Sequence, residues 1–264
     1  MTRGERRPEP QPSEASPRGE GRPEPQGQAP QRGARSEAQP SEVNQVKLRH
    51  NKVELALHAL RGGDGPALML LHGLGERSPA RVPAELASWP GPVFALDFTG
   101  HGDSTVPRGG GYTSEILMGD VDAALEHIGA ATLVGRGIGA YIALLCAGAR
   151  PKLVRGAILR DGPGLAGGSA RPGTPQIPMP DPNAEAPPDP FALVELAADV
   201  RPPDYATSFA RQAAHLSGLE RPISVCTLER PDWLRAVVEE PGVEACECDE
   251  ALAVYAASAR GAKR

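Results

Sequence analysis

The residues with the clearest chemical meaning form a short motif that lacks its reactive member. The segment Val134-Gly135-Arg136-Gly137-Ile138-Gly139-Ala140 has the form of a strand that turns sharply into a helix. In that setting the pattern Gly-x-Ser-x-Gly presents a nucleophilic hydroxyl at the turn. Gly135 and Gly139 are present, but Gly137 stands where the nucleophile would be. Glycine has no side chain that can attack a carbonyl, so the motif predicts a turn without a nucleophile.

Two further motifs precede this turn in a fixed order. The apolar run Leu68–Leu71 leads into His72-Gly73-Leu74-Gly75, and Val93–Leu96 leads into Asp97-Phe98-Thr99-Gly100-His101-Gly102-Asp103-Ser104. From Val46 to the C-terminus the chain therefore resembles the α/β-hydrolase superfamily. That family carries HGxG after its third strand, DxxGHGxS after its fourth and the nucleophile turn after its fifth.

The resemblance implies an α/β-hydrolase fold over residues 44–264, with a mostly parallel central sheet flanked by helices. Apolar runs and helical periodicity indicate where its elements lie. We expect an opening hairpin at 46–59, strands at 68–71, 93–96, 131–134, 154–159, 222–228 and 243–248, and helices at 113–128, 138–149, 191–198, 205–216 and from about Trp233.

The resemblance also implies an oxyanion hole made of backbone groups. Its two donors would be the N–H groups of Leu74 and Ile138, and they do not depend on the side chain at position 137. Residues expected to shape the pocket around them are His72, Gly73, Asp97, His101 and Arg136.

Three carboxylates are candidates for the acid of a catalytic triad. Glu229 and Asp232 follow the expected seventh strand, and Asp161 follows the sixth. Each has a structural alternative: Asp232 is placed to cap the helix that begins near Trp233, and Asp161 has the turn chemistry typical of aspartate.

The histidine of a triad has no candidate in its family position. The family places this base after the eighth strand, but the last histidine of the chain is His215, in an apolar-periodic helix before the seventh. Two of three triad positions are therefore empty, which argues against acyl-enzyme chemistry of the usual kind. The alternative is an active hydrolase or lyase in which His72 or His101 serves as base.

Composition excludes several functional classes. The formal net charge of −5 gives no basic surface for nucleic acid, and no apolar run is long enough to span a bilayer. Residues 1–41 lack the apolar core of a signal peptide. We therefore expect a cytoplasmic protein, with neither nucleic acid nor membrane as partner.

The four cysteines give no metal-binding pattern. Cys146, Cys226, Cys246 and Cys248 lack zinc-type spacing and a neighbouring histidine, so we expect reduced thiols, no metal and no cofactor. In a strand over 243–248, Cys246 and Cys248 would point to opposite faces of the sheet.

Two segments are predicted to be irregular. Residues 1–43 are rich in Pro, Gln, Glu, Arg, Gly and Ser and contain no aromatic residue, so they are expected to form a disordered tail. The segment Gly162–Pro190 is dominated by Gly, Pro, Ala and Asp, which predicts a flexible loop and little or no helical cap over the pocket.

A disordered tail buries nothing, so its removal should not affect the folded domain. Deletion of the residues before Val43 is expected to leave the melting temperature almost unchanged. Thermal unfolding of the two proteins, followed by circular dichroism, checks this. A drop of many degrees would mean that the tail packs on the domain.

These observations leave three functional hypotheses. The first is a catalytically degenerate hydrolase relative that binds a small carbonyl ligand or a protein partner. The second is the active enzyme with non-standard catalytic groups. The third is an interaction module in which the tail is the recognition element.

Overall fold

The computed structural model describes residues 44–168, 175–179 and 188–261. The tail predicted for residues 1–43 lies outside these residues. The strands are β1 (Asn44–His50), β2 (Val53–Arg61), β3 (Ala67–Leu71), β4 (Val93–Leu96), β5 (Ala131–Arg136), β6 (Val154–Arg160), β7 (Ile223–Cys226) and β8 (Val243–Ala245). The helices are α1 (Ser114–Ile128), α2 (Ile138–Ala149), α3 (Pro190–Ala198), α4 (Pro203–Leu216), α5 (Asp232–Val238) and α6 (Cys248–Gly261), with a short 3-10 helix, η1, at Ala84–Leu86.

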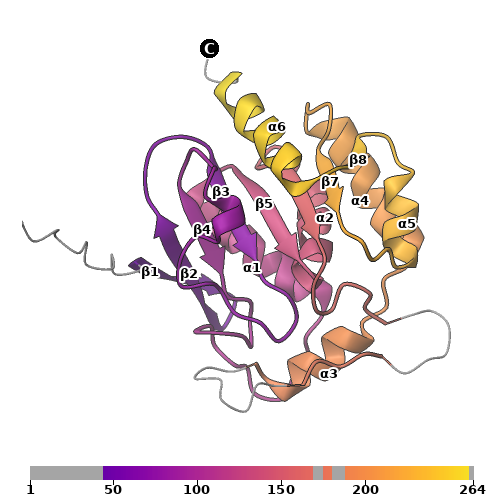
Figure 1. Ribbon diagram of the computed structural model, residues 1–264. Helices are drawn as coiled ribbons and strands as arrows, with labels where there is room; N and C mark the ends of the chain where they lie inside the picture. The colour runs from indigo at the N-terminus through magenta and orange to yellow at the C-terminus, as the bar shows by residue number, and fades with distance from the viewer. Residues whose placement is uncertain (1–43, 169–174, 180–187, 262–264) are drawn as a thin grey trace, which may run out of the picture. The chain divides into compact units, whose positions relative to one another are not determined.

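The eight strands form one sheet in the order β1-β2-β4-β3-β5-β6-β7-β8 (Figure 1). Only β2 runs antiparallel to its neighbours, and every pair from β4 to β8 is parallel. Strands β3 and β4 are apolar along their whole length, and β5 is buried up to its last residue, Arg136, as expected for strands that are covered on both faces. The predicted α/β fold with a mostly parallel sheet is confirmed.

Each face of the sheet has its own hydrophobic cluster. The larger cluster joins the sheet to α1, α2, α4 and α5, and the smaller one joins it to η1 and α6. Helix α2 is buried along almost its whole length, because it packs on the sheet and on α4 at once. This packing fixes α2 and the turn that precedes it.

The sequence located most elements within one or two residues, but Asp232 does not cap α5 as predicted. Pro231 occupies the N-cap position, and Asp232 is the first residue of the helix. Helix α4 begins in the same way, with Pro202 at the N-cap and Asp204 in the first turn. Proline tolerates a helix start because its missing N–H would be unpaired there. The aspartates interact favourably with the positive end of the helix from their actual positions.

The eighth strand is also shorter than predicted. It ends at Ala245, and Cys248 already begins α6. Cys246 and Cys248 therefore do not alternate across a sheet, and both pack against the smaller cluster. The prediction that they point to opposite faces is wrong, because it assumed a strand that continues to residue 248.

No helix lies over the sheet between β6 and α3 in the part of this segment that the structure describes. Its first residues, 161–165, are nevertheless held by hydrogen bonds to five other parts of the chain: the loop after β3, the start of α2, Arg201, the segment after β7, and α5. The predicted flexible loop is therefore wrong for these five residues, and residues 169–174 and 180–187 lie outside the described part of the chain.

Candidate functional site

The turn between β5 and α2 has the backbone of a nucleophile turn. Gly137 has a positive φ of 59°, and the helix begins at the next residue. The two flanking glycines are required by close backbone contacts. A Cβ on Gly135 would lie 2.1 Å from the carbonyl oxygen of Gly139, and one on Gly139 would lie 2.5 Å from that of Leu71. The turn therefore has the close backbone packing of a nucleophile turn, although it has no reactive side chain.

The space at the tip of the turn is filled by the chain itself. A Cβ on Gly137 would lie 2.0 Å from the carbonyl oxygen of Pro163. Real Cβ atoms do not approach another atom so closely, so only glycine fits position 137 while Pro163 stays in place. The residue that removes the nucleophile also makes room for this carbonyl.

The same carbonyl oxygen accepts both backbone donors that the sequence identified as oxyanion-hole candidates. The N–H groups of Leu74 and Ile138 each donate to Pro163 O at 3.0 Å. Two backbone donors that converge on one carbonyl oxygen have the arrangement of an oxyanion hole. Here their acceptor comes from the loop after β6, so the hole is occupied by a peptide group of the protein.

This loop, residues 161–165, is called the plug loop below. All five of its carbonyl groups accept hydrogen bonds from groups outside or within the loop. Arg136 donates to the carbonyl of Asp161, and Leu165 N–H donates to that of Gly162. Because every acceptor is paired, opening of the plug loop would break a complete hydrogen-bond set.

Two buried side chains that sequence reasoning missed hold the end of the plug loop. The guanidinium of Arg201 donates to the carbonyls of Gly164 and Leu165, and the Trp233 indole N–H donates to the latter at 2.9 Å. Arg201 is 4% exposed and lies over the Tyr141 ring at 4.7 Å. Burial lowers its pKa to about 10, which leaves it charged at neutral pH. Neither residue belongs to a sequence motif, so no signal pointed to them.

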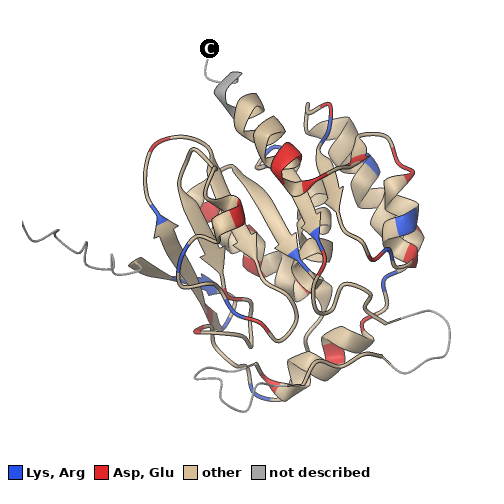
Figure 2. Cartoon of the chain, in the orientation of Figure 1, with Lys and Arg blue, Asp and Glu red and all other residues tan. Residues whose placement is uncertain are grey.

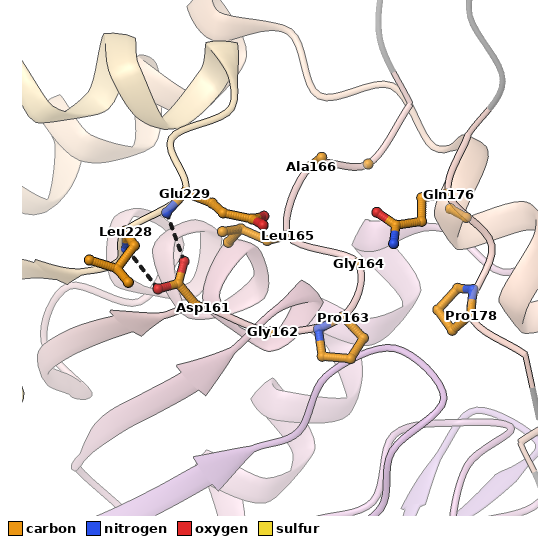
Figure 3. Close-up of a pocket in the computed structure, with 12 residues that line it drawn as sticks. Asp161, Gly162, Pro163, Gly164, Leu165, Ala166, Gln176, Pro178, Leu228 and Glu229 are labelled. Carbon is orange, nitrogen blue, oxygen red and sulfur yellow. Dashed lines mark hydrogen bonds between the residues drawn. The ribbon is translucent and has the colours of Figure 1, made fainter. Parts of the chain in front are cut away.

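Asp161 anchors the other end of the plug loop. Its carboxylate oxygens accept the backbone N–H groups of Leu228 and Glu229 at 2.7 and 3.0 Å (Figure 3). The carboxylate therefore joins the loop to the segment after β7. Both oxygens of Asp161 are therefore used by backbone donors more than sixty residues away, and not by its own turn as proposed from the sequence.

The other two acid candidates lie near this junction without a histidine partner among the described residues. Glu229 lines a cavity of about 520 Å³ beside the plug loop, together with Leu228, Gln176 and Pro178 (Figure 3). Asp232 is exposed and pairs with Arg235 one helical turn later. His215, the last histidine, lies exposed in the final turn of α4.

His72 and His101 are buried, and each uses both ring nitrogens. His72 Nδ1 donates to the carbonyl of Gly73 at 2.8 Å, while Nε2 accepts Phe98 N–H at 3.1 Å. His101 Nδ1 donates to the carbonyl of Thr99, and Nε2 accepts Gly75 N–H, both at 3.2 Å. Neither ring has a lone pair left to take a proton from a substrate.

The environment of the two rings keeps them neutral. Burial lowers the pKa of both, to about 3 for His101. The two rings lie 5.1 Å apart, so a charge on one disfavours a charge on the other. They brace the loops that carry Gly73, Gly75 and Thr99.

Arg136 and Asp97 complete the set of pocket-shaping candidates. Arg136 Nε lies 3.0 and 2.9 Å from the two carboxylate oxygens of Glu76, and Glu76 in turn accepts Gly73 N–H. The bond to Glu76 raises the pKa of Arg136. These contacts hold the loop after β3 against the turn after β5.

Asp97 is fully buried under the opposite end of the same loop. Its oxygens accept Ser78 N–H at 2.6 Å, Asp103 N–H at 2.8 Å and His58 Nε2 at 2.9 Å. His58, Asp97 and Asp103 are also the one group among the described residues with a spacing that could hold a metal ion. Because backbone donors already occupy both oxygens of Asp97, we assign the group a structural role.

The comparisons with known proteins identify the family and the fold. Residues 68–262 match the alpha/beta hydrolase family. The chain belongs to the alpha/beta hydrolase family. A search of curated proteins found no match.

Two solved structures show the same alpha/beta hydrolase fold. A thioesterase domain from the curacin biosynthetic pathway is 17% identical, with a TM-score of 0.58 over 83% of this chain and 97% of that domain. A hypothetical protein from Pseudomonas aeruginosa PAO1 is 19% identical, with a TM-score of 0.56 over 84% of this chain and 100% of that protein. At these identities the likeness extends to the fold and not to a substrate.

Two features bear on the classes excluded by composition. Figure 2 shows positive and negative residues interspersed along the described part of the chain. Among the described residues, no helix is both long and apolar enough to cross a membrane.

Proposed function

We propose that this alpha/beta hydrolase family member is catalytically degenerate and acts by binding a small ligand or a protein partner. The observation that carries the proposal is the Pro163 carbonyl oxygen, 3.0 Å from the N–H groups of both Leu74 and Ile138. A peptide carbonyl of the protein holds the place that a substrate carbonyl would need.

Catalysis would require that this place be vacant and that a nucleophile face it. The same oxygen atom prevents both, because it accepts the two donors and would lie 2.0 Å from a Cβ at position 137. A rearranged plug loop would free the donors, but it would not supply a hydroxyl at Gly137. The lack of a nucleophile at position 137 therefore does not depend on whether the plug loop moves, whereas the filled oxyanion hole does.

The remaining histidines support the same proposal. An alternative mechanism needs a base within reach of a substrate proton. His72 and His101 both have their two nitrogens engaged by backbone groups, and burial lowers the pKa of each. A neutral ring without a free lone pair is a poor general base.

The occupied donors also bear on what is bound. A carbonyl ligand would have to displace Pro163 O and break the hydrogen bonds of the plug loop, which favours a partner that binds elsewhere. The cavity of about 520 Å³ beside the loop is accessible without that change. Leu228, 95% exposed at its rim, offers an apolar contact to a protein partner.

The test of degeneracy is covalent labelling. The full chain is expected to show no labelling by a fluorophosphonate probe and no turnover of p-nitrophenyl esters. An active serine hydrolase of the same fold serves as the positive control. Specific labelling that a substitution in the loops around Gly137 abolishes would contradict the proposal, because it would reveal a nucleophile.

A thermal-shift screen separates the two kinds of binding. Acids, lactones and amides are expected to leave the melting temperature unchanged, because the two N–H groups that would bind their carbonyl oxygen already donate to Pro163 O. A ligand at 100 times its Kd would stabilise the fold by about 2.7 kcal/mol, which such a screen detects. A clear shift with a carbonyl ligand would show that the plug loop yields and would favour the small-ligand form of the proposal.

A further inference from the structure

Three of the four cysteines converge at one place in the fold. Cys226 ends β7, Cys246 follows β8 directly, and Cys248 begins α6. The parallel register pairs Val225 with Ala245, so Cys226 and Cys246 are the next residues along the two strands. Cys246 N–H also donates to the carbonyl of Val225 at 3.2 Å. The three side chains are half-buried and pack against the same hydrophobic cluster.

Within this group, Cys226 lies at the end of β7, with Cys246 next to it after β8 and Cys248 at the start of α6, and its thiol interacts with both. The interaction with the Cys226 thiol, helped by the charge of Arg160, lowers the pKa of Cys248 to about 7. The same contact raises the pKa of Cys226. One thiol of the pair is thus favoured as the thiolate and the other as its hydrogen-bond donor.

The position of Cys248 in the fold also favours its thiolate form. It is the first residue of α6, where the unpaired N–H groups of the first turn favour a negative charge. Arg160 stands opposite Cys226 in the register of β6 and β7, so its guanidinium is part of the same neighbourhood. Burial instead raises the pKa of Cys246, and it also raises that of Cys146, which lies buried in α2.

We propose that Cys248 and Cys226 form a thiol oxidation site that reacts with hydroperoxides and closes to a disulfide. The site lies outside the degenerate turn at Gly137 and does not depend on the proposed binding function.

The reaction proceeds in two balanced steps. The Cys248 thiolate attacks the terminal oxygen of the hydroperoxide. The O–O bond breaks, the sulfur becomes a sulfenic acid, and the leaving oxygen takes a proton to give an alcohol, or water from hydrogen peroxide. The Cys226 sulfur then attacks the Cys248 sulfur. The S–O bond breaks, the thiol proton and the hydroxyl leave as water, and the S–S bond forms.

The roles are assigned from the positions of the two residues. Cys248 attacks because it begins α6, where the backbone N–H groups of the first turn favour a thiolate. Cys226 resolves because it ends β7 and packs against the same hydrophobic cluster. Cys246 is the matched control, since it is equally half-buried in the same cluster but has a raised pKa.

The experiment oxidises the reduced full chain with hydrogen peroxide and then alkylates the remaining thiols under denaturing conditions. Mass spectrometry is expected to find two fewer alkylated cysteines of the four in the chain, and peptide mapping is expected to join Cys226 to Cys248. A map that joins Cys246 to either of them, or four alkylated thiols after oxidation, would overturn the proposal. The wild-type chain suffices for this result.

Variants then test the order of the two steps. Cys246→Ser is expected to form the same disulfide as the wild type. Cys226→Ser should accumulate a sulfenic acid on Cys248 that dimedone labels, and Cys248→Ser should show no such label. Each variant is first compared with the wild type by thermal unfolding. Dimedone labelling on Cys226 in the folded Cys248→Ser protein would reverse the assigned roles and contradict the proposal.

Discussion

Gly137→Ser is expected to destabilise the fold strongly and to show no esterase activity. The new Cβ would lie 2.0 Å from Pro163 O, so the plug loop must move and lose the bonds from Leu74 and Ile138. Overpacking and the positive φ each cost about 1–3 kcal/mol. A loss of about 3–5 kcal/mol would lower the melting temperature by on the order of 10 °C.

Two alanine variants separate the causes of this loss. Gly137→Ala adds the Cβ without the hydroxyl and should be destabilised about as much as Gly137→Ser. Gly218→Ala places a Cβ at a φ of 73° with no atom within 4 Å, so it reports the backbone cost alone, about 1–2 kcal/mol. Urea unfolding of the three variants gives the comparison.

The outcome for activity is independent of stability. A serine at position 137 could not be deprotonated by His72 or His101, because both ring nitrogens of each are engaged by backbone groups. Efficient turnover of an activated ester by folded Gly137→Ser would show that a base has been missed. A Gly137→Ser protein as stable as the wild type would show instead that the plug loop leaves the site at little cost.

The fold could be predicted from the sequence because its signals are side-chain patterns. Continuous apolar runs mark β3 and β4, and the apolar periodicity of α1 marks its buried face. The first residue of a helix is harder to predict. Asp204 and Asp232 are of a residue type that often caps helices, but they lie one or two positions inside α4 and α5. When a proline precedes the aspartate, residue type alone does not show which of the two is the N-cap.

The state of the candidate site could be predicted only in part. The missing nucleophile at Gly137 is visible in the sequence because it is a side chain. The filled oxyanion hole is not, because its acceptor is a backbone carbonyl whose direction depends on the path of the plug loop. That path depends on Arg201 and Trp233, which lie far along the chain and belong to no motif. The sequence also did not show that Cys226, Cys246 and Cys248 lie together, because their grouping depends on where β8 ends and α6 begins.

Asp97→Asn is expected to have the second large effect, a loss of about 2–4 kcal/mol at neutral pH. One carboxylate oxygen accepts Ser78 N–H, and the other accepts Asp103 N–H together with His58. In either orientation, the asparagine amide would point its NH₂ group at the N–H of Ser78 or of Asp103. One of these buried N–H groups would then have no acceptor. Asp103→Asn changes an exposed neighbour and should cost less than about 1 kcal/mol.

The same carboxylate predicts an acid-dependent difference between wild type and variant. Burial alone would raise the pKa of Asp97, but the bond from His58 and the two backbone N–H groups hold it well below its ordinary value. A carboxyl with a lowered folded-state pKa adds stability above its unfolded pKa of about 4, and loses it as the pH falls toward the folded value. Urea unfolding at pH 7 and pH 3 should therefore show the gap between wild type and Asp97→Asn narrowing at pH 3. An unchanged gap would mean that Asp97 is not the charged acceptor that holds the loops after β3 and β4 together.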